Sequence, residues 1–172
     1  MAGSERWLVG KIVSGGQTGA DRAALDWARS RGVDHGGWCP KGRLAADGPL
    51  LVHYQLRETE SAGYRQRTKL NVRDSDATLV LNTGDLDGGT LQTVRFAQTL
   101  SKPHLVVQLD EVGQGAVVHR VRAWLIDGRF GTLNVAGPRE EKRPGIYAAV
   151  ASVLDLCLNI GGAVDRQDDS KD

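Results

Sequence analysis

Residues 8–28 of the chain read LVGKIVSGGQTGADRAALDWA. Leu8 to Ser14 is a mostly apolar stretch of strand length, and the turn Gly15-Gly16-Gln17-Thr18-Gly19 follows it directly. Ala24, Leu25 and Ala28 then fall on one face of a helix. A strand, a glycine turn and a helix in this order are typical of an α/β domain.

The same alternation continues to the end of the chain. Further strands are expected at Gly37 to Cys39, Ala77 to Leu81, Leu105 to Leu109 and Thr132 to Val135. Helical patterns cover Tyr64 to Val72, Leu91 to Ala97, Val117 to Leu125 and Ile146 to Leu158. Leu44 to Ser61 has no clear period and is expected to be a long surface loop. The pattern predicts a Rossmann-like three-layer α/β fold, with a mostly parallel sheet and helices on both faces.

Length and composition limit the other possibilities. A chain of 172 residues suits one domain, which we place at residues 6–162, with disordered polar tails at 1–5 and 163–172. A net charge of +1 gives no overall field that would attract nucleic acid. No run approaches the roughly 18 apolar residues of a membrane span, so we expect a cytoplasmic protein without membrane or nucleic-acid partners.

The metal-ligating residue types are scattered. Cys39 and Cys157 lie far apart, and the four histidines form no paired motif. We therefore expect reduced thiols and no metal held by the protein.

Three glycine-bearing loops follow predicted strands, at Ser14 to Asp21, Asn82 to Thr90 and Asn134 to Glu140. In a parallel α/β sheet such loops meet at the carboxyl edge, where ligands bind. Glycine admits an anion close to the backbone, and the helix N-termini that follow favour negative charge. The expected ligand is a phosphate-bearing small molecule; the alternative is that these glycines only make tight turns. The candidate binding residues here are Gly15, Gly16, Gln17, Thr18, Gly19, Asp21, Asn82, Thr83, Gly84, Gly88, Gly89, Thr90, Asn134, Gly137, Arg139 and Glu140.

Charged side chains near these loops have two interpretations each. Asp21 could accept hydrogen bonds from ribose hydroxyls or ring N–H groups, or could simply stabilise the first turn of its helix. Lys41, Arg43 and Arg139 could bind phosphate, or could be solvated surface cations. Of these three side chains, Arg139 is the strongest candidate for phosphate binding, because it lies within a glycine-bearing loop.

Familiar catalytic motifs are missing. Ala20 and Asp21 stand where a P-loop would place its lysine after Gly19. The glycine spacing also differs from the dinucleotide fingerprint, and no Ser-His-Asp or Cys-His arrangement is recognisable. Hydrolysis of nucleoside triphosphates and hydride transfer are therefore disfavoured.

Five ordered motifs resemble those of a known family. They are SGGQTGADR (14–22), GWCPKGR (37–43), NVRDSD (71–76), DGGT (87–90) and NVAGPRE (134–140). The chain resembles the molybdenum carrier family, the circularly permuted branch of the SLOG superfamily of Rossmann-like nucleotide binders. The resemblance runs from about residue 11 to residue 158.

The resemblance implies a protein that holds molybdenum cofactor (molybdopterin) and protects it until a molybdoenzyme apoprotein takes it. The cofactor's own sulfurs would hold the metal, and related carriers are homo-oligomers, which makes a dimer or tetramer the expectation. By analogy the phosphate end would lie near Gly16, Thr18, Gly19 and 88–90, with Arg139 and Glu140 nearby.

The same superfamily contains phosphoribohydrolases that release a base from nucleoside monophosphates. Their similar glycine-glycine-threonine turn is followed shortly by a glutamate, whereas this chain continues Leu91-Gln92-Thr93. Without that carboxylate the activity is not expected here, unless Glu140 supplies another acid. A cofactor carrier, a sensor of a nucleotide derivative and a hydrolase thus remain, in that order of preference.

Overall fold

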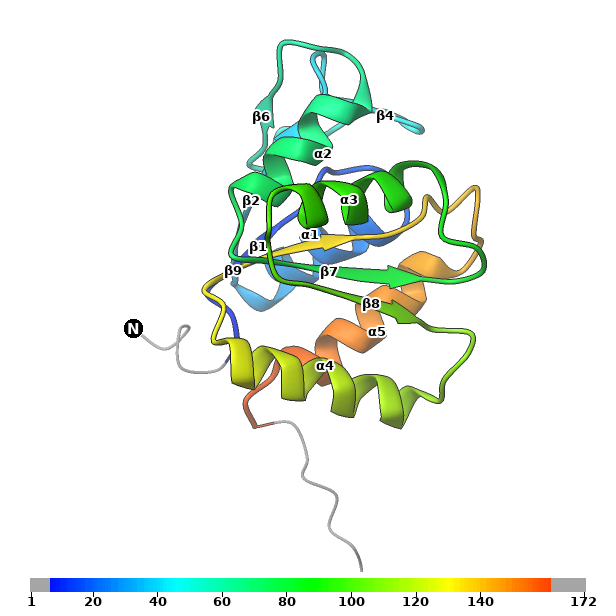
Figure 1. Ribbon diagram of the computed structural model, residues 1–172. Helices are drawn as coiled ribbons and strands as arrows, with labels where there is room; N and C mark the ends of the chain where they lie inside the picture. Colours follow the sequence, from blue (N-terminus) through cyan, green and yellow to red (C-terminus); the bar gives the residue numbers. More distant parts are fainter. Residues whose placement is uncertain (1–6, 162–172) are drawn as a thin grey trace, which may run out of the picture.

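The computed structural model describes residues 7–161 and is built around a five-stranded sheet (Figure 1). Its strands follow the order β2 (Asp34–Gly36), β1 (Lys11–Val13), β9 (Thr132–Ala136), β7 (Ala77–Asn82) and β8 (His104–Gln108). Every neighbouring pair is parallel. All residues of β7 are buried, which agrees with its continuous apolar run and with a sheet covered on both faces.

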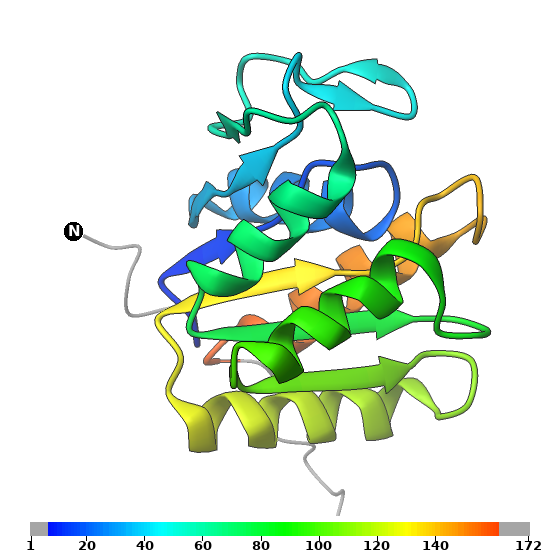
Figure 2. The ribbon, with the colours of Figure 1, turned by 45° about the horizontal axis from the view of Figure 1, so that its top comes forward.

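Helices form the two outer layers (Figures 1 and 2). One face of the sheet carries α1 (Ala20–Arg31), α4 (Gln114–Gly128) and α5 (Ile146–Leu158), and the other carries α2 (Tyr64–Arg73) and α3 (Gly88–Thr99). The main core packs α1, α4 and α5 against the sheet, while Val72, Phe96 and Ala97 pack α2 against α3. This arrangement confirms the predicted Rossmann-like α/β class.

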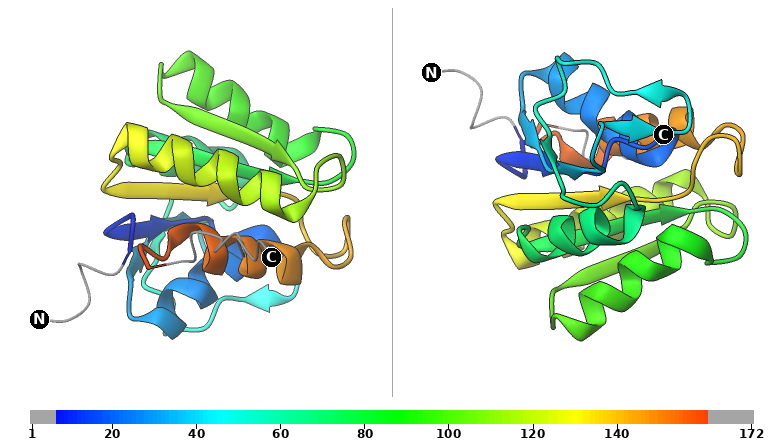
Figure 3. Two further views of the ribbon diagram at one scale, coloured as in Figure 1. Left: turned by 90° about the horizontal axis from the view of Figure 1, so that it is seen from below. Right: turned by 90° about the horizontal axis from the view of Figure 1, so that it is seen from above.

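The strand order brings three loops together. β9 is the last strand in sequence but lies in the centre of the sheet, between β1 and β7. The carboxyl ends of β1, β9 and β7 are therefore neighbours, and the loops after them share one edge (Figure 3). A crevice at such a change in strand order is where open α/β sheets bind ligands.

The second strand of the sheet was predicted in the wrong place. It is Asp34–Gly36, whereas Trp38–Cys39 forms β3 of a separate ribbon with β6 (Arg57–Glu58). Gly37 separates the two with φ +129°, a backbone conformation that glycine adopts readily. A Cβ there would lie 2.5 Å from the Ser14 carbonyl oxygen, so the chain leaves the sheet at a position that only glycine fits. β1 is also shorter than predicted, since it begins at Lys11.

The expected surface loop at 44–61 is in fact partly buried. It contains β4 (Leu44–Ala45), β5 (Gly48–Pro49) and β6, and it closes a small core over α1. That core consists of Leu25, Cys39, Leu50, Tyr54 and Leu56. The prediction failed because the buried residues in this segment follow neither a helical nor a strand period.

The predicted tails lie outside the described residues. Within residues 7–161, no helix has the length and apolar character that crossing a membrane requires.

Candidate functional site

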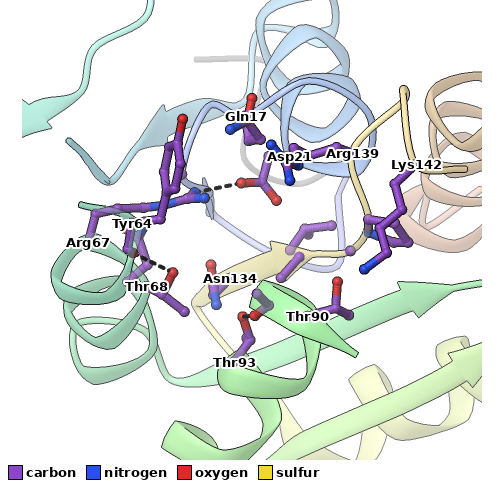
Figure 4. A pocket seen from close by; sticks show the side chains of 18 of the residues that line it. Gln17, Asp21, Tyr64, Arg67, Thr68, Thr90, Thr93, Asn134, Arg139 and Lys142 are labelled. Carbon is purple, nitrogen blue, oxygen red and sulfur yellow. Dashed lines mark hydrogen bonds and ion pairs between the residues drawn. The ribbon is translucent and has the colours of Figure 1, made fainter. Parts of the chain in front are cut away.

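A cleft opens at the carboxyl edge of the sheet, between the loops after β1, β7 and β9 and one face of α2 (Figure 4). Its lining comprises Gly15, Gln17, Asp21, Tyr64, Arg67, Thr68, Asn71, 87–90, Thr93, 134–139 and Lys142. Backbone amides and the Lys142 ammonium lie at one end of the cleft, and an ion pair lies at the other.

The first end is the start of α3. The first main-chain hydrogen bond of this helix runs from the Leu91 N–H to the Asp87 carbonyl, over 3.0 Å, and the Asp87 side chain does not cap the helix. The amides of 88–90 therefore have no partner among residues 7–161, as expected for a first helical turn. A Cβ on Gly89 would meet nothing within 4 Å. This end can thus accept an anion on backbone donors, aided by the helix dipole.

Two cations from the loop after β9 line the same cleft. Arg139 is exposed and lines the cleft. Lys142 reaches across the mouth to form an ion pair with Asp87. The hydrogen bond from Lys142 lowers the pKa of Asp87. An anion in the cleft could therefore contact the exposed Arg139 side chain and also Lys142, which is already paired with Asp87 of the loop after β7.

The second end is an ion pair between α1 and α2. Arg67 Nη1 donates to Asp21 Oδ2 over 2.7 Å, and the two side chains are 11% and 9% exposed. A Cβ on Gly15 would lie 1.4 Å from Arg67 Nη1, so glycine lets the guanidinium lie directly over the first loop. The Tyr64 ring packs against the same guanidinium, 5.4 Å from its carbon to the ring centroid.

The floor between these ends is polar but largely satisfied. Thr93 Oγ1 donates to the Gly89 carbonyl over 3.0 Å, and Thr68 Oγ1 donates to the Tyr64 carbonyl over 2.8 Å. Asn134 Nδ2 donates to Thr78 Oγ1 over 3.2 Å. These groups fix the shape of the cleft and leave few side-chain donors for a ligand.

The predicted binding residues fall into two groups. Nine of them line the cleft: Gly15, Gln17, Asp21, Gly88, Gly89, Thr90, Asn134, Gly137 and Arg139. The remainder lie outside its lining: Gly16, Thr18, Gly19, Lys41, Arg43, Asn82, Thr83, Gly84 and Glu140.

Several residues of the second group hold the loops in place. A Cβ on Gly19 would lie 2.5 Å from the Pro138 carbonyl oxygen, so the first and third loops touch there. Arg43 donates to four carbonyls of its own segment, those of Leu50, Leu51, Tyr54 and Leu56, instead of facing the cleft. Asn82 Nδ2 donates to the Gly84 carbonyl over 2.9 Å and shapes the turn after β7.

Glu140 is occupied by the start of α5. Its Oε1 accepts from the Gly145 N–H over 2.6 Å, and its Oε2 accepts from the Tyr147 N–H over 2.9 Å. Both carboxylate oxygens therefore stabilise a helix N-terminus.

Sequence reasoning missed the contribution of α2. Tyr64, Arg67, Thr68 and Asn71 all line the cleft, and their spacing places them on one face of a helix. The repeat of polar side chains at that spacing was a usable signal, but the sequence analysis predicted only a helix at Tyr64 to Val72 and assigned it no binding face. Lys142 was missed as well, because nothing local relates it to Asp87.

The described part of the chain contains no group of three or more His, Cys, Asp and Glu side chains placed to hold a metal ion. The cleft lining includes neither histidine nor cysteine.

Comparison with known proteins now gives the family. Residues 12–158 match the circularly permutated YpsA SLOG family. The chain belongs to this family. A crystal structure from Syntrophus aciditrophicus SB, named "Putative molybdenum carrier protein", is 43% identical with a TM-score of 0.86. The match covers 90% of this chain and 98% of that one. A search of curated proteins found no match. These similarities indicate a ligand-binding protein.

Proposed function

We propose that this SLOG protein binds molybdenum cofactor in the cleft, protects it and releases it to a molybdoenzyme apoprotein. The observation that carries the proposal is the free start of α3, where the amides of 88–90 lie near Lys142 in a cleft that Arg139 also lines. A phosphomonoester fits such a receptor, because backbone donors and a helix dipole bind an anion without a dedicated side-chain cage.

The other half of the cofactor is a pterin, a flat heterocycle with polar edges. The far end of the cleft offers the Asp21 carboxylate and the Tyr64 ring, which suit the edge and the face of such a ring. A relative named for carrying molybdenum, at 43% identity, supports the same choice of ligand.

The lining also suits a cargo that brings its own metal ligands. Neither thiol nor imidazole reaches the cleft, so the molybdenum would stay on the dithiolene sulfurs of the cofactor. The lining leaves those sulfurs without a competing soft ligand from the protein.

The test is to purify the protein from a host that makes molybdenum cofactor and from a host that cannot. Molybdenum is measured by mass spectrometry, and the pterin by its fluorescence after oxidation. The proposal predicts both signals in stoichiometric ratio from the first host and neither from the second. Protein from the first host that contains no pterin would contradict it.

We further propose that the bound ligand is not turned over. Glu140, the candidate acid from the sequence, is engaged by two backbone amides, and no glutamate follows Thr90 within its helical turn. Incubation with adenosine or guanosine monophosphate, followed by chromatography, should release no free base. Steady release of base that disappears in Glu140→Gln would establish a hydrolase instead.

A further inference from the structure

Building on the proposed function, we propose that Asp21 recognises the aminopyrimidinone edge of the ligand's ring, and that Arg67 positions the carboxylate for this task. That edge carries an amino group beside a ring N–H, and it is shared by pterins and guanine. The cleft would thereby select phosphorylated rings of this class over adenine.

The carboxylate has acceptor capacity that the protein does not use. Arg67 Nη1 occupies one site on Asp21 Oδ2, and Oδ1 accepts no hydrogen bond from residues 7–161. A carboxylate offers about four acceptor sites in all. The Asp21 side chain is only 9% exposed, and it points into the cleft from the first turn of α1 (Figure 4). An acceptor this well enclosed is better matched to a ligand's donors than to bulk water.

The geometry of the edge fits two adjacent oxygens. In guanine and in pterins the ring N–H and the amino group point the same way, so each can donate to one oxygen of Asp21. Adenine presents a ring nitrogen with a lone pair at the equivalent place, which would face the carboxylate as a second acceptor. A site built for donors discriminates strongly against such a ring, because its buried carboxylate would be left unpaired.

Arg67 acts on the carboxylate rather than on the ligand. Its Nη1 hydrogen bond fixes the Asp21 rotamer, and its positive charge lies directly beside the carboxylate. Its own Nε is buried without a hydrogen-bond partner among residues 7–161, which costs free energy. The pair is therefore arranged at some expense in stability, as expected where a functional group must be held in one orientation.

The experiment is isothermal titration calorimetry of the full chain, purified free of ligand. The probes are neopterin monophosphate, guanosine monophosphate, inosine monophosphate, adenosine monophosphate and ribose phosphate. We expect the first two to bind about tenfold or more tightly than the adenine nucleotide, the scale of one hydrogen bond to a charged group. Inosine monophosphate, which lacks the amino group, should bind more weakly than the guanine nucleotide.

Asp21→Asn should remove this preference while its affinity for ribose phosphate stays within about twofold, which also shows that the variant is folded. The matched control is Asp85→Asn, the same change of charge at an exposed position outside the lining. Equal binding of adenine and guanine nucleotides, together with no preference for the pterin, would overturn the inference; so would a preference that survives in Asp21→Asn. If the protein carries molybdenum cofactor but shows no preference among these probes, only the role of Asp21 is refuted. If the protein carries no cofactor, the proposed function itself is refuted.

Discussion

Thr18 Oγ1 donates a hydrogen bond of 2.6 Å to Glu141 Oε2 and so joins the loop after β1 to the loop after β9. Each loop carries one part of the cleft wall, since Gln17 lies next to Thr18 and Arg139 lies close to Glu141. The hydrogen bond from Thr18 is the main reason why the pKa of Glu141 is lowered. A side-chain contact between two loops that lie far apart in the sequence therefore helps to shape the cleft.

The first prediction concerns this contact. Thr18→Val removes the donor at nearly constant volume, so the pKa of Glu141 should rise toward its ordinary value of 4.5. The pKa of Glu141 is lower in the folded protein than in the unfolded chain. The contact therefore stabilises the fold at pH values above the ordinary pKa, and this stabilisation is lost as the pH falls through the folded-state pKa. NMR titration of the Glu141 carboxyl carbon measures the shift. Thr99→Val, at an exposed hydroxyl bonded to its own helix, is the control and should leave the Glu141 titration as it was.

The second prediction concerns access to the start of α3. Gly89→Val should abolish measurable binding of neopterin monophosphate, because the new side chain enters the space that the anion needs. Thermal stability without ligand should change by less than about 1 kcal/mol, since valine replaces a glycine in a helix with open space around it. Calorimetry and thermal melting measure the two effects.

A matched control exists for this variant. Gly115 is the second residue of α4, as Gly89 is of α3, and a Cβ there also meets nothing within 4 Å. Gly115→Val should bind the ligand normally. If Gly89→Val keeps its affinity, or loses as much stability as affinity, the glycine serves the fold and not the ligand.

The third prediction concerns the free cation at the mouth. Arg139→Ala should weaken binding of neopterin monophosphate by about 1 to 3 kcal/mol, the scale of a hydrogen bond to a charged group. The loss should shrink as salt is added, because Arg139 is exposed and its charge is screened. Arg120→Ala, at an exposed position on α4, controls for the change in net charge. An affinity unchanged at low salt would show that Arg139 does not contact the phosphate.

The sequence was sufficient to predict the loops that form the cleft, for a physical reason. The apolar run at 77–81 and the glycine turn at 15–19 are local signals, and the rule that ligands bind beyond the carboxyl ends of parallel strands joins them. Asp34–Gly36 was missed because an edge strand of polar residues lacks the apolar pattern that marks a buried one.

The ion pair between Asp21 and Arg67 could not be predicted in the same way. Its partners are 46 positions apart, and they meet only because α2 packs beside the first loop. Likewise, Glu140 stands in the right loop, but its orientation toward the start of α5 follows from the turn at Gly145. Residue type and loop membership thus identify candidates, whereas the direction of each side chain depends on contacts made across the fold.

The most direct test of the central claim is a crystal structure of the protein with molybdenum cofactor retained from the host. We expect the phosphate within hydrogen-bond distance of the amides of 88–90, and the pterin at the Asp21 end of the cleft. A cofactor bound elsewhere on the protein, or held in the cleft with its phosphate away from α3, would contradict it.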